Sequence, residues 1–432
     1  MGGIEERIKP PKVNGVNPTR RRVVEVGNWW YAAPTGVEPR PAQQGAMSTT
    51  TTTASTTPPP SEHRYPHRAA GARSPWIVSP RFDLAIVLVP MMVALGTLFL
   101  IRGLSIREPL WAYLVFFVAF DVAHVWGTIY ITYLDQEVME RRRRLLVGVV
   151  PVCFVAACGA HLISPTLFWT VLAYVAIVHF IKQQYGFIAI YRAKGRERSP
   201  WDRRLDSWAL WVGALGPVVL WHATPQAQFD WFGSGEQFAL TLPPSVQPVV
   251  WAVWGATAVV WVGRQLHMAM TEGRFNVGKA VWMVASWVSW YVGIRLADHL
   301  FISAAFINLM HGVPYLGLIW FRCNVRWQGE DGHRLGGLSP LVAWLSQRRH
   351  WVAFYLVVFT LALLEEALWD GLVWGKYLPA LLGVDAPTLS AVALSLLVAL
   401  LSLPQIVHYA LDSFLWKMDG TNPDLERALK GS

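Results

Sequence analysis

The sequence is poor in charged residues and almost free of cysteine. Aspartate, glutamate, lysine and arginine make up 15% of the 432 residues, while hydrophobic residues make up 53%. The three cysteines are Cys153, Cys158 and Cys323, and none belongs to a CxxC pair. We therefore interpret them as small buried apolar residues and expect no disulfide framework.

The N-terminal region lacks the features of a folded domain, and we predict a disordered tail over 1–80. Its run STTTTTASTTPPP at 48–60 is low in complexity and cannot bury a core. No apolar stretch precedes that run, so we expect no cleavable signal peptide. Met47 directly precedes it, and we hypothesise that translation starts there and leaves 1–46 untranslated. An N-terminal peptide mass from before Met47 would refute this hypothesis.

Long apolar runs dominate the rest of the chain. They predict an all-α, polytopic helical membrane protein whose membrane domain covers 81–417, followed by a short cytoplasmic tail at 418–432. The 24 tryptophans fit aromatic belts at the two membrane interfaces. We predict about ten transmembrane helices, at 83–101, 109–134, 145–162, 166–190, 205–222, 246–264, 279–295, 299–321, 351–369 and 388–412.

Basic residues alternate between the connecting loops. The net charge is +9, and most lysines and arginines lie in the N-terminal tail or in every second loop. The basic loops are 141–144, 192–204, 264–279 and 322–349. By the positive-inside rule both termini are cytoplasmic, and the charge contacts anionic headgroups of the lipid bilayer rather than nucleic acid. We expect an integral, multi-pass protein of a bacterial inner or plasma membrane.

Two segments between spans have their own character. Loop 223–245 has no lysine or arginine and is expected to cap the outer face. Residues 338–349 combine an apolar patch with two arginines, which predicts a short helix lying in the inner interface.

Four histidines interrupt the apolar spans, one on each of spans two, four, eight and ten. They are His124, His179, His311 and His408. All four spans run in the same direction through the membrane. Nine to thirteen residues separate each histidine from the first charged residue taken to mark the inner membrane surface, or roughly 14–20 Å of helix. The histidines therefore form one layer in the cytoplasmic half, where ionisable groups usually mark a site.

Each histidine has a polar residue three or four positions away, on its own helix face. These neighbours are Asp121, Gln183, Asn308 and Asp412. We expect them to orient the imidazoles or, for the two aspartates, to serve as ligands. Further candidates in the same zone are Tyr315, Lys182, Tyr185, Gln405 and Tyr409. We predict that the imidazole nitrogens converge within about 3–5 Å of one another or of a common point.

Such a cluster favours a metal centre. Imidazole and carboxylate ligands suit iron, manganese, copper or zinc and disfavour an iron–sulfur cluster. We rank one or two non-haem iron ions first. Haem ranks lower, because one layer accommodates at most one bis-histidine haem and leaves two histidines unexplained.

In layout, this membrane layer of histidines and carboxylates resembles the membrane-bound non-haem iron oxygenases. Fatty-acid desaturases carry HxxxH and HxxHH boxes, whereas no two histidines of the membrane domain at 81–417 lie within five residues of each other. Its histidines, spread over separate helices, are more similar to those of the bacterial integral-membrane β-carotene dioxygenases. The resemblance covers roughly 83–417, has no residue-level motif match, and implies an iron-dependent, O₂-using reaction on a hydrophobic polyene or lipid.

Three functions follow from these observations, in order of preference. The first is a metal-dependent oxidoreductase acting on a hydrophobic or amphiphilic substrate, with an electron-donor protein among the partners it allows. Apolar residues around the cluster and a basic cytoplasmic rim would suit a substrate with a long tail and an anionic or polar head. The second is a proton- or cation-coupled transporter. The third is an acyl- or glycosyl-transferase in which Asn308 orients His311 as a general base.

Overall fold

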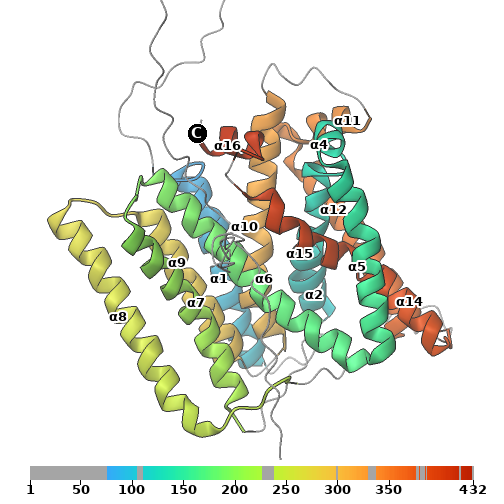
Figure 1. Cartoon of the computed structure of the whole chain (residues 1–432), viewed down its shortest axis with the longest axis horizontal. Helices are drawn as coiled ribbons and strands as arrows, with labels where there is room; N and C mark the ends of the chain where they lie inside the picture. Colours follow the sequence, from blue (N-terminus) through green and yellow to red (C-terminus); the bar gives the residue numbers. More distant parts are fainter. Residues whose placement is uncertain are drawn as a thin grey trace, which may run out of the picture.

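The computed structural model describes residues 75–104, 110–225, 238–297, 300–328, 337–375, 379, 385, 387–417 and 420–430. Within these ranges the chain is helical and contains no strand, as the sequence predicts (Figure 1). Almost all of the predicted N-terminal tail, with the hypothesised start at Met47, lies outside the described residues. The middle of the predicted outer loop also lies outside them.

Among the described residues, seven helical segments are long and apolar enough to cross a membrane. They are Pro80–Leu104 (α1), Trp111–Ile131, Arg143–Ile163 (α5), Pro165–Lys194 (α6), Pro244–Thr271, Leu300–Trp327 and Arg348–Trp374. Ala391–Leu401 (α14) and Leu403–Leu415 (α15) make an eighth if the pair, bent by 45°, is taken as one span. The polytopic all-α architecture is therefore confirmed for the described residues.

Several of these spans are composites of shorter elements. The second contains α2 (Leu110–Tyr113), the π-helix η1 (Leu114–Val122), α3 (Ala123–Gly127) and the 3₁₀-helix η2 (Thr128–Ile131). The span Pro244–Thr271 contains η3 (Pro244–Val246) and α8 (Gln247–Thr271), and the span Leu300–Trp327 lies within α10 (Leu300–Gln328). The span Arg348–Trp374 contains η6 (Arg348–His350), α12 (Trp351–Trp369) and the π-helix η7 (Asp370–Trp374). Outside these spans lie α4 (Gln136–Arg141), α7 (Pro200–His222), α9 (Val277–Trp290), the π-helix η4 (Tyr291–Leu296), α11 (Ser339–Leu345) and α16 (Pro423–Lys430).

Two of the ten predicted spans are helical but are not among the long apolar segments. Predicted span 205–222 falls on α7, whose apolar run is broken by Asp206 and His222. Predicted span 279–295 falls on α9, which has only 14 α-helical residues before the backbone changes to the π-helix η4. Both helices pack against each other, and α7 also packs against α8 (Figure 1).

Capping residues fix where α6 and α7 begin. The Ser164 hydroxyl accepts a hydrogen bond from the Leu167 backbone N–H, and Pro165 occupies the first turn of α6. Ser199 caps α7 in the same way. A side-chain acceptor followed by proline is a strong start signal, because it satisfies a free N–H and presets the backbone. The start of α6 in turn sets the depth of His179.

The basic connections all lie at one end of the bundle, together with α4, α11 and α16 (top of Figure 1). Helix α11 and the turn η6 occupy the range predicted as an interfacial helix. The predicted C-terminal tail includes α16, whose Leu425 and Leu429 are buried and which packs against α10. The cytoplasmic assignment of this end remains a prediction from charge.

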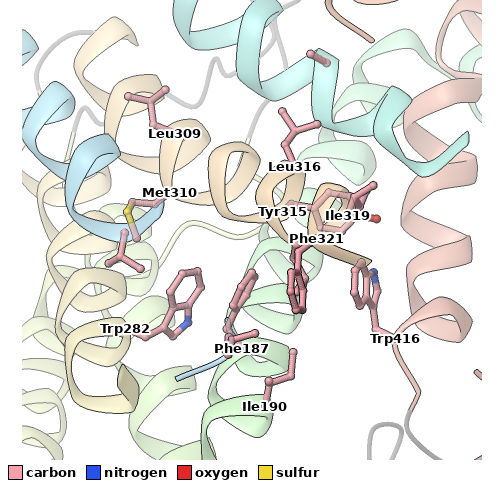
Figure 2. Close-up of a cluster of buried hydrophobic side chains, with 14 of the residues drawn as sticks. Phe187, Ile190, Trp282, Leu309, Met310, Tyr315, Leu316, Ile319, Phe321 and Trp416 are labelled. Atoms are coloured by element: carbon pink, nitrogen blue, oxygen red, sulfur yellow. The ribbon is translucent and has the colours of Figure 1, made fainter. Parts of the chain in front are cut away.

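Helix α10 lies at the centre of the bundle and carries much of its core. Figure 2 shows its residues Leu309, Met310, Tyr315, Leu316, Ile319 and Phe321 among side chains of other helices, with Phe187 and Ile190 of α6 nearby. Gly312 allows η1 to approach α10, because a Cβ at this position would overlap the Phe120 carbonyl oxygen. That close contact sets His311 beside the element that leads into His124.

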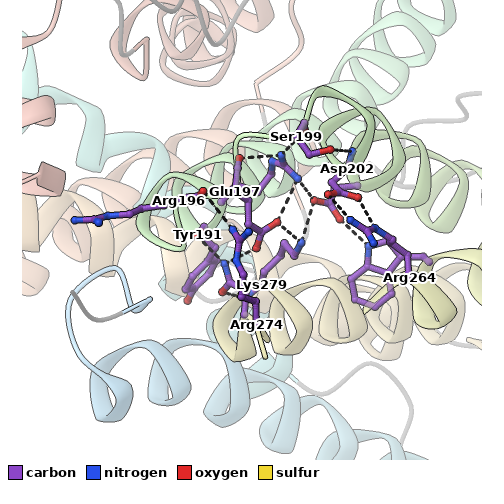
Figure 3. Close-up of polar contacts among 12 residues, drawn as sticks. Tyr191, Arg196, Glu197, Ser199, Asp202, Arg264, Arg274 and Lys279 are labelled. Carbon is purple, nitrogen blue, oxygen red and sulfur yellow. Dashed lines mark hydrogen bonds and ion pairs between the residues drawn. The ribbon is translucent and has the colours of Figure 1, made fainter. Parts of the chain in front are cut away.

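Four charged residues from three helices and one loop form a buried ion-pair network, which we call the inner network: Arg192, Glu197, Asp206 and Lys279. Lys279 is fully buried, and its Nζ lies 2.6 Å from Glu197 Oε2 and 3.1 Å from Asp206 Oδ2. Arg192 pairs with both carboxylates. Figure 3 shows Lys279 and Glu197 of this network side by side. The sequence suggested only a topological role for these basic residues, but here they tie α6, α7 and α9 together.

Candidate metal centre

The four predicted histidines come together in one buried cluster. His124 is on α3, His179 on α6, His311 on α10 and His408 on α15. All four are buried, and one nitrogen from each lies within 4.8 Å of the others. The His179 and His408 Nε2 atoms are 3.2 Å apart. The predicted convergence is confirmed, and it comes from elements up to 284 residues apart in the chain, the separation of His124 and His408.

The site contains a chain of hydrogen bonds that the sequence did not reveal in full. His408 Nδ1 lies 2.8 Å from Thr128 Oγ1, which lies 3.3 Å from the Tyr315 hydroxyl. Tyr315 in turn donates to Asp412 Oδ1 at 2.6 Å. A carboxylate can only accept hydrogen bonds, so every donor in this series points toward Asp412. Thr128 therefore donates to Tyr315, and the Nδ1–H of His408 donates to Thr128. This direction leaves the lone pair of His408 Nε2 facing the cluster.

A backbone carbonyl orients His124 in a similar way. His124 Nδ1 lies 3.3 Å from the carbonyl oxygen of Phe120, one turn earlier in the π-helix η1. A donor at Nδ1 leaves Nε2 with a free lone pair. Insertions of π-helix are common at functional sites because they reset the direction of the side chains that follow.

Three buried imidazole nitrogens of the cluster have no hydrogen-bond partner in the described part of the chain. They are His124 Nε2 and both nitrogens of His311. The His311 ring is held instead by stacking on Phe180, with ring centroids 3.8 Å apart. A buried polar atom without a partner costs about 1–3 kcal/mol, so several such atoms converging on one point need an explanation. A metal ion bound between the rings would supply a partner for His124 Nε2 and for one of the two His311 nitrogens.

The donor set fits a nitrogen-binding metal but does not identify it. Four neutral imidazoles suit zinc, copper or iron. Two carboxylates lie just outside the ring of nitrogens. Asp412 Oδ2 is 3.8 Å from His179 Nε2, and Asp121 Oδ1 is 3.9 Å from His124 Nδ1. Both predicted aspartates are thus adjacent to the cluster, and Asp412 is the more firmly held, by Tyr315 and Trp416.

The two predicted amide partners bind elsewhere. Gln183 Nε2 donates to the His311 backbone carbonyl at 2.8 Å, and Asn308 Nδ2 donates to the Phe116 carbonyl at 3.3 Å. Neither amide reaches an imidazole nitrogen. Helical spacing correctly places each amide on the same helix face as its histidine. It does not determine the hydrogen-bond partner, because a backbone carbonyl of a neighbouring helix can accept from the buried amide instead. Both amides therefore join helices at the crossing points around the site.

Sequence reasoning missed Thr128, although a signal for it exists. Thr128 lies four residues after His124, the same spacing that singled out Asp412. The other histidines among the described residues take no part in the cluster. His161 contacts Ser395, His222 contacts Tyr174 and its own helix backbone, and His350 contacts a backbone carbonyl.

A cavity of about 120 Å³ borders the cluster between α6, α10, α15 and α16. His179, Tyr315, Tyr409 and Asp412 contribute to its wall near the histidines. Its two ends along α6 are lined by apolar side chains: Val175 and Val178 at one end, and Phe187 and Ile190 with Leu425 and Leu429 of α16 at the other. These ends agree with the apolar chamber expected from the sequence.

Comparison with known proteins gives no match to a protein-family model, to a curated protein or to a solved structure. Functional conclusions therefore depend on the geometry of this site.

Proposed function

We propose that this chain is a membrane-bound, metal-dependent oxidoreductase that uses non-haem iron and acts on a lipid or isoprenoid. One observation carries the proposal: four buried histidines bring one nitrogen each within 4.8 Å of the others, and nitrogens of His124 and His311 have no hydrogen-bond partner among the described residues, beside a cavity with apolar ends. Nitrogen-rich ligation with carboxylates nearby is a typical environment for non-haem iron. The layout resembles the membrane histidine-cluster oxygenases, which supports the same reaction class.

The chain's own residues have distinct tasks in this proposal. The four histidines would hold one or two iron ions, which when bound supply the activation of dioxygen. Thr128, Tyr315 and Asp412 hold His408 in the tautomer that presents Nε2, and Phe120 does the same for His124. The surrounding helices exclude water from the site. The cavity would admit the hydrophobic part of the substrate.

Metal analysis tests the proposal directly. We expect the detergent-purified protein to contain about one or two iron ions per chain, and His311→Leu to lose them. His350→Leu is the matched control, because His350 lies at the basic end and is not part of the cluster. Iron-dependent oxygen consumption with a lipid or isoprenoid substrate would support the reaction class. A wild-type protein that stays metal-free after incubation with iron would contradict the proposal.

One observation favours proton-coupled transport as a second candidate. Glu365 and Glu366 lie in a membrane span toward the end of the bundle opposite the basic connections, and Asp121 lies midway along another span. Trp126 donates to Glu365, and Tyr113 hydrogen-bonds Glu366, while neither glutamate pairs with a cation among the described residues. Buried acidic residues of this kind form proton relays in transporters. Proton flux in proteoliposomes that is abolished by Glu365→Gln, together with metal-free protein, would favour transport over oxidation.

The geometry around Asn308 does not favour the transferase alternative. It required the Asn308 amide to orient His311 as a general base. The Asn308 side chain donates to the Phe116 carbonyl, and neither His311 nitrogen has a hydrogen-bond partner.

A further inference from the structure

Lys182 places a cation inside the cavity that borders the histidine cluster. It lies on α6 three residues after His179, about 4.5 Å farther along the helix axis, and contributes to the cavity wall. Its side chain is partly buried, and it forms no hydrogen bond or ion pair with the described residues. An unpaired ammonium group at this depth is costly, which makes Lys182 a candidate for binding a ligand.

The position of Lys182 excludes the usual explanation for a lysine in a membrane helix. Lysines near helix ends extend their side chains to the headgroups. Ten residues separate Lys182 from Arg192, the next basic residue on α6, which corresponds to about 15 Å of helix. A lysine side chain spans about 6 Å, so its ammonium group remains well below the headgroup layer.

Lys279 is a buried lysine with a structural role and provides a comparison for Lys182. Lys279 is fully buried and contacts two carboxylates, Glu197 and Asp206. Lys182 has no such carboxylate and faces a cavity instead. Asp412, a carboxylate on the same cavity wall, is hydrogen-bonded by Tyr315 and Trp416, so an anionic group of a molecule in the cavity would balance the charge of Lys182.

The cavity wall defines the rest of that molecule. Near Lys182 and His179 the wall is polar, while both ends along α6 are apolar. Val175 and Val178 are exposed on the outer surface of α6, at the depth of the histidines, so this end adjoins the lipid. A ligand that fits has an anionic group at Lys182 and a hydrocarbon chain along an apolar end.

We infer that Lys182 binds the anionic group of the substrate, and that the substrate is a single-chain amphiphile with a carboxylate or phosphate close to the reacting carbon. This inference rests on the proposed function, because it takes the cavity to be the substrate site of the metal centre. It narrows the substrate class from any lipid or isoprenoid to one with an anionic head.

Binding of defined amphiphiles to the full chain in detergent tests the inference without requiring activity. The probes are oleate, oleoyl lysophosphatidate and the uncharged oleyl alcohol. We expect the wild type to bind at least one anionic probe about tenfold or more tightly than the alcohol. Lys182→Met should remove this preference, and Lys182→Arg should keep most of it. Lys194→Met, in the last turn of the same helix and outside the cavity, is the matched control and should bind like the wild type.

The two anionic probes distinguish the sources of the charge, since oleate carries a carboxylate and lysophosphatidate a phosphate. Equal binding of all three probes by the wild type, or an anion preference that persists in Lys182→Met, would overturn the inference. Iron content measured on the same samples separates it from the proposed function. Iron-loaded protein with no anion preference contradicts only the role of Lys182. Metal-free protein with a Lys182-dependent preference contradicts only the oxidoreductase.

Discussion

The inner network and the histidine cluster are both buried polar regions, but they differ in whether their polar atoms have partners. In the inner network each of the four charged side chains lies within 3.3 Å of an opposite charge. Trp261 and Asn276 add hydrogen bonds to its carboxylates. In the histidine cluster three ring nitrogens have no partner, and the nearest carboxylate oxygens lie 3.8–3.9 Å from an imidazole nitrogen.

This difference separates a structural region from a binding site. Burial alone does not, because both regions are shielded from water. A fully paired network joins helices and leaves nothing for a ligand to bind. Converging atoms without partners destabilise the fold unless something binds them, so they indicate a site. The comparison predicts that substitutions in the inner network change stability and that substitutions around the cluster change metal binding.

The largest expected effect is on stability and comes from Asp206→Asn. Asp206 contacts Arg192 and Lys279 and accepts a hydrogen bond from Trp261. Neutralising it leaves two buried cations facing one carboxylate. We expect a loss of about 3–5 kcal/mol of unfolding free energy, because removing one partner strands a buried charge. Thermal unfolding of the detergent-purified protein measures the loss.

The same variant tests whether the two regions are separate. Iron per folded chain should stay at the wild-type value in Asp206→Asn, since none of its contacts involves a histidine. Metal loss in protein that is still folded would show that the inner network belongs to the site, and the comparison would fail.

The next effect is on metal affinity and comes from Asp412→Asn. Asp412 ends the hydrogen-bond chain from His408 and lies beside His179. We expect iron affinity to fall roughly ten- to a hundredfold, which is typical of lost partners around metal ligands. Asp121→Asn should have a smaller effect, because the Phe120 carbonyl already holds His124. Competition with a chelator measures both affinities, and unchanged values in both variants would assign the aspartates to structure.

A smaller loss of metal affinity is expected for Thr128→Val. Valine keeps the shape of threonine but removes the hydroxyl that links His408 to Tyr315. One hydrogen bond is worth about 0.5–1.5 kcal/mol, so iron affinity should fall roughly two- to tenfold. Thr132→Val is the matched control, because the Thr132 hydroxyl donates to the Thr128 backbone carbonyl one turn away. An equal effect in both variants would show that the hydrogen-bond chain does not orient His408.

The smallest effect concerns acid and the ion pair between Asp202 and Arg264. Arg264 Nε lies 2.7 Å from Asp202 Oδ1, and this hydrogen bond lowers the pKa of Asp202 below its usual value. A lowered pKa contributes stability above the unfolded value of about 3.9 and loses it as pH falls through the folded value. Because Arg264 is partly exposed, we expect Asp202→Asn to cost only roughly 0.5–1 kcal/mol at pH 7. The difference from the wild type in thermal unfolding should shrink toward pH 3. A difference that stays constant with pH would exclude this ion pair as its source.

The sequence predicted the cluster because its signals are local and periodic. The four histidines share a depth and a direction that follow from counting residues, and Asp412 follows from helical spacing. The destinations of Gln183 and Asn308 could not be predicted, since each depends on a carbonyl of another helix. Spacing along span two also assumed a regular α-helix, whereas η1 is a π-helix.

The inner network escaped sequence reasoning for a related reason. Arg192 and Lys279 lie beside predicted loops, where a positive charge ordinarily marks topology. Their pairing with Glu197 and Asp206 depends on how α6, α7 and α9 meet, which no single segment encodes. The same limit applies to α7. Its sequence predicts a helix, but whether that helix spans the bilayer depends on how it packs against other helices.

The placement of the fourth histidine on α15 sets an order for biogenesis. His311 is synthesised 97 residues before His408. If the helices insert in the order of their synthesis, three of the four histidines enter the membrane before the last one. Until α15 inserts, the cluster is open on one side and lacks both His408 and Asp412. Delivery of an ion that needs all four nitrogens must therefore be a late event. Binding of the ion would then link α15 to the helices that carry the other three histidines. Metal binding and completion of the fold would therefore be coupled.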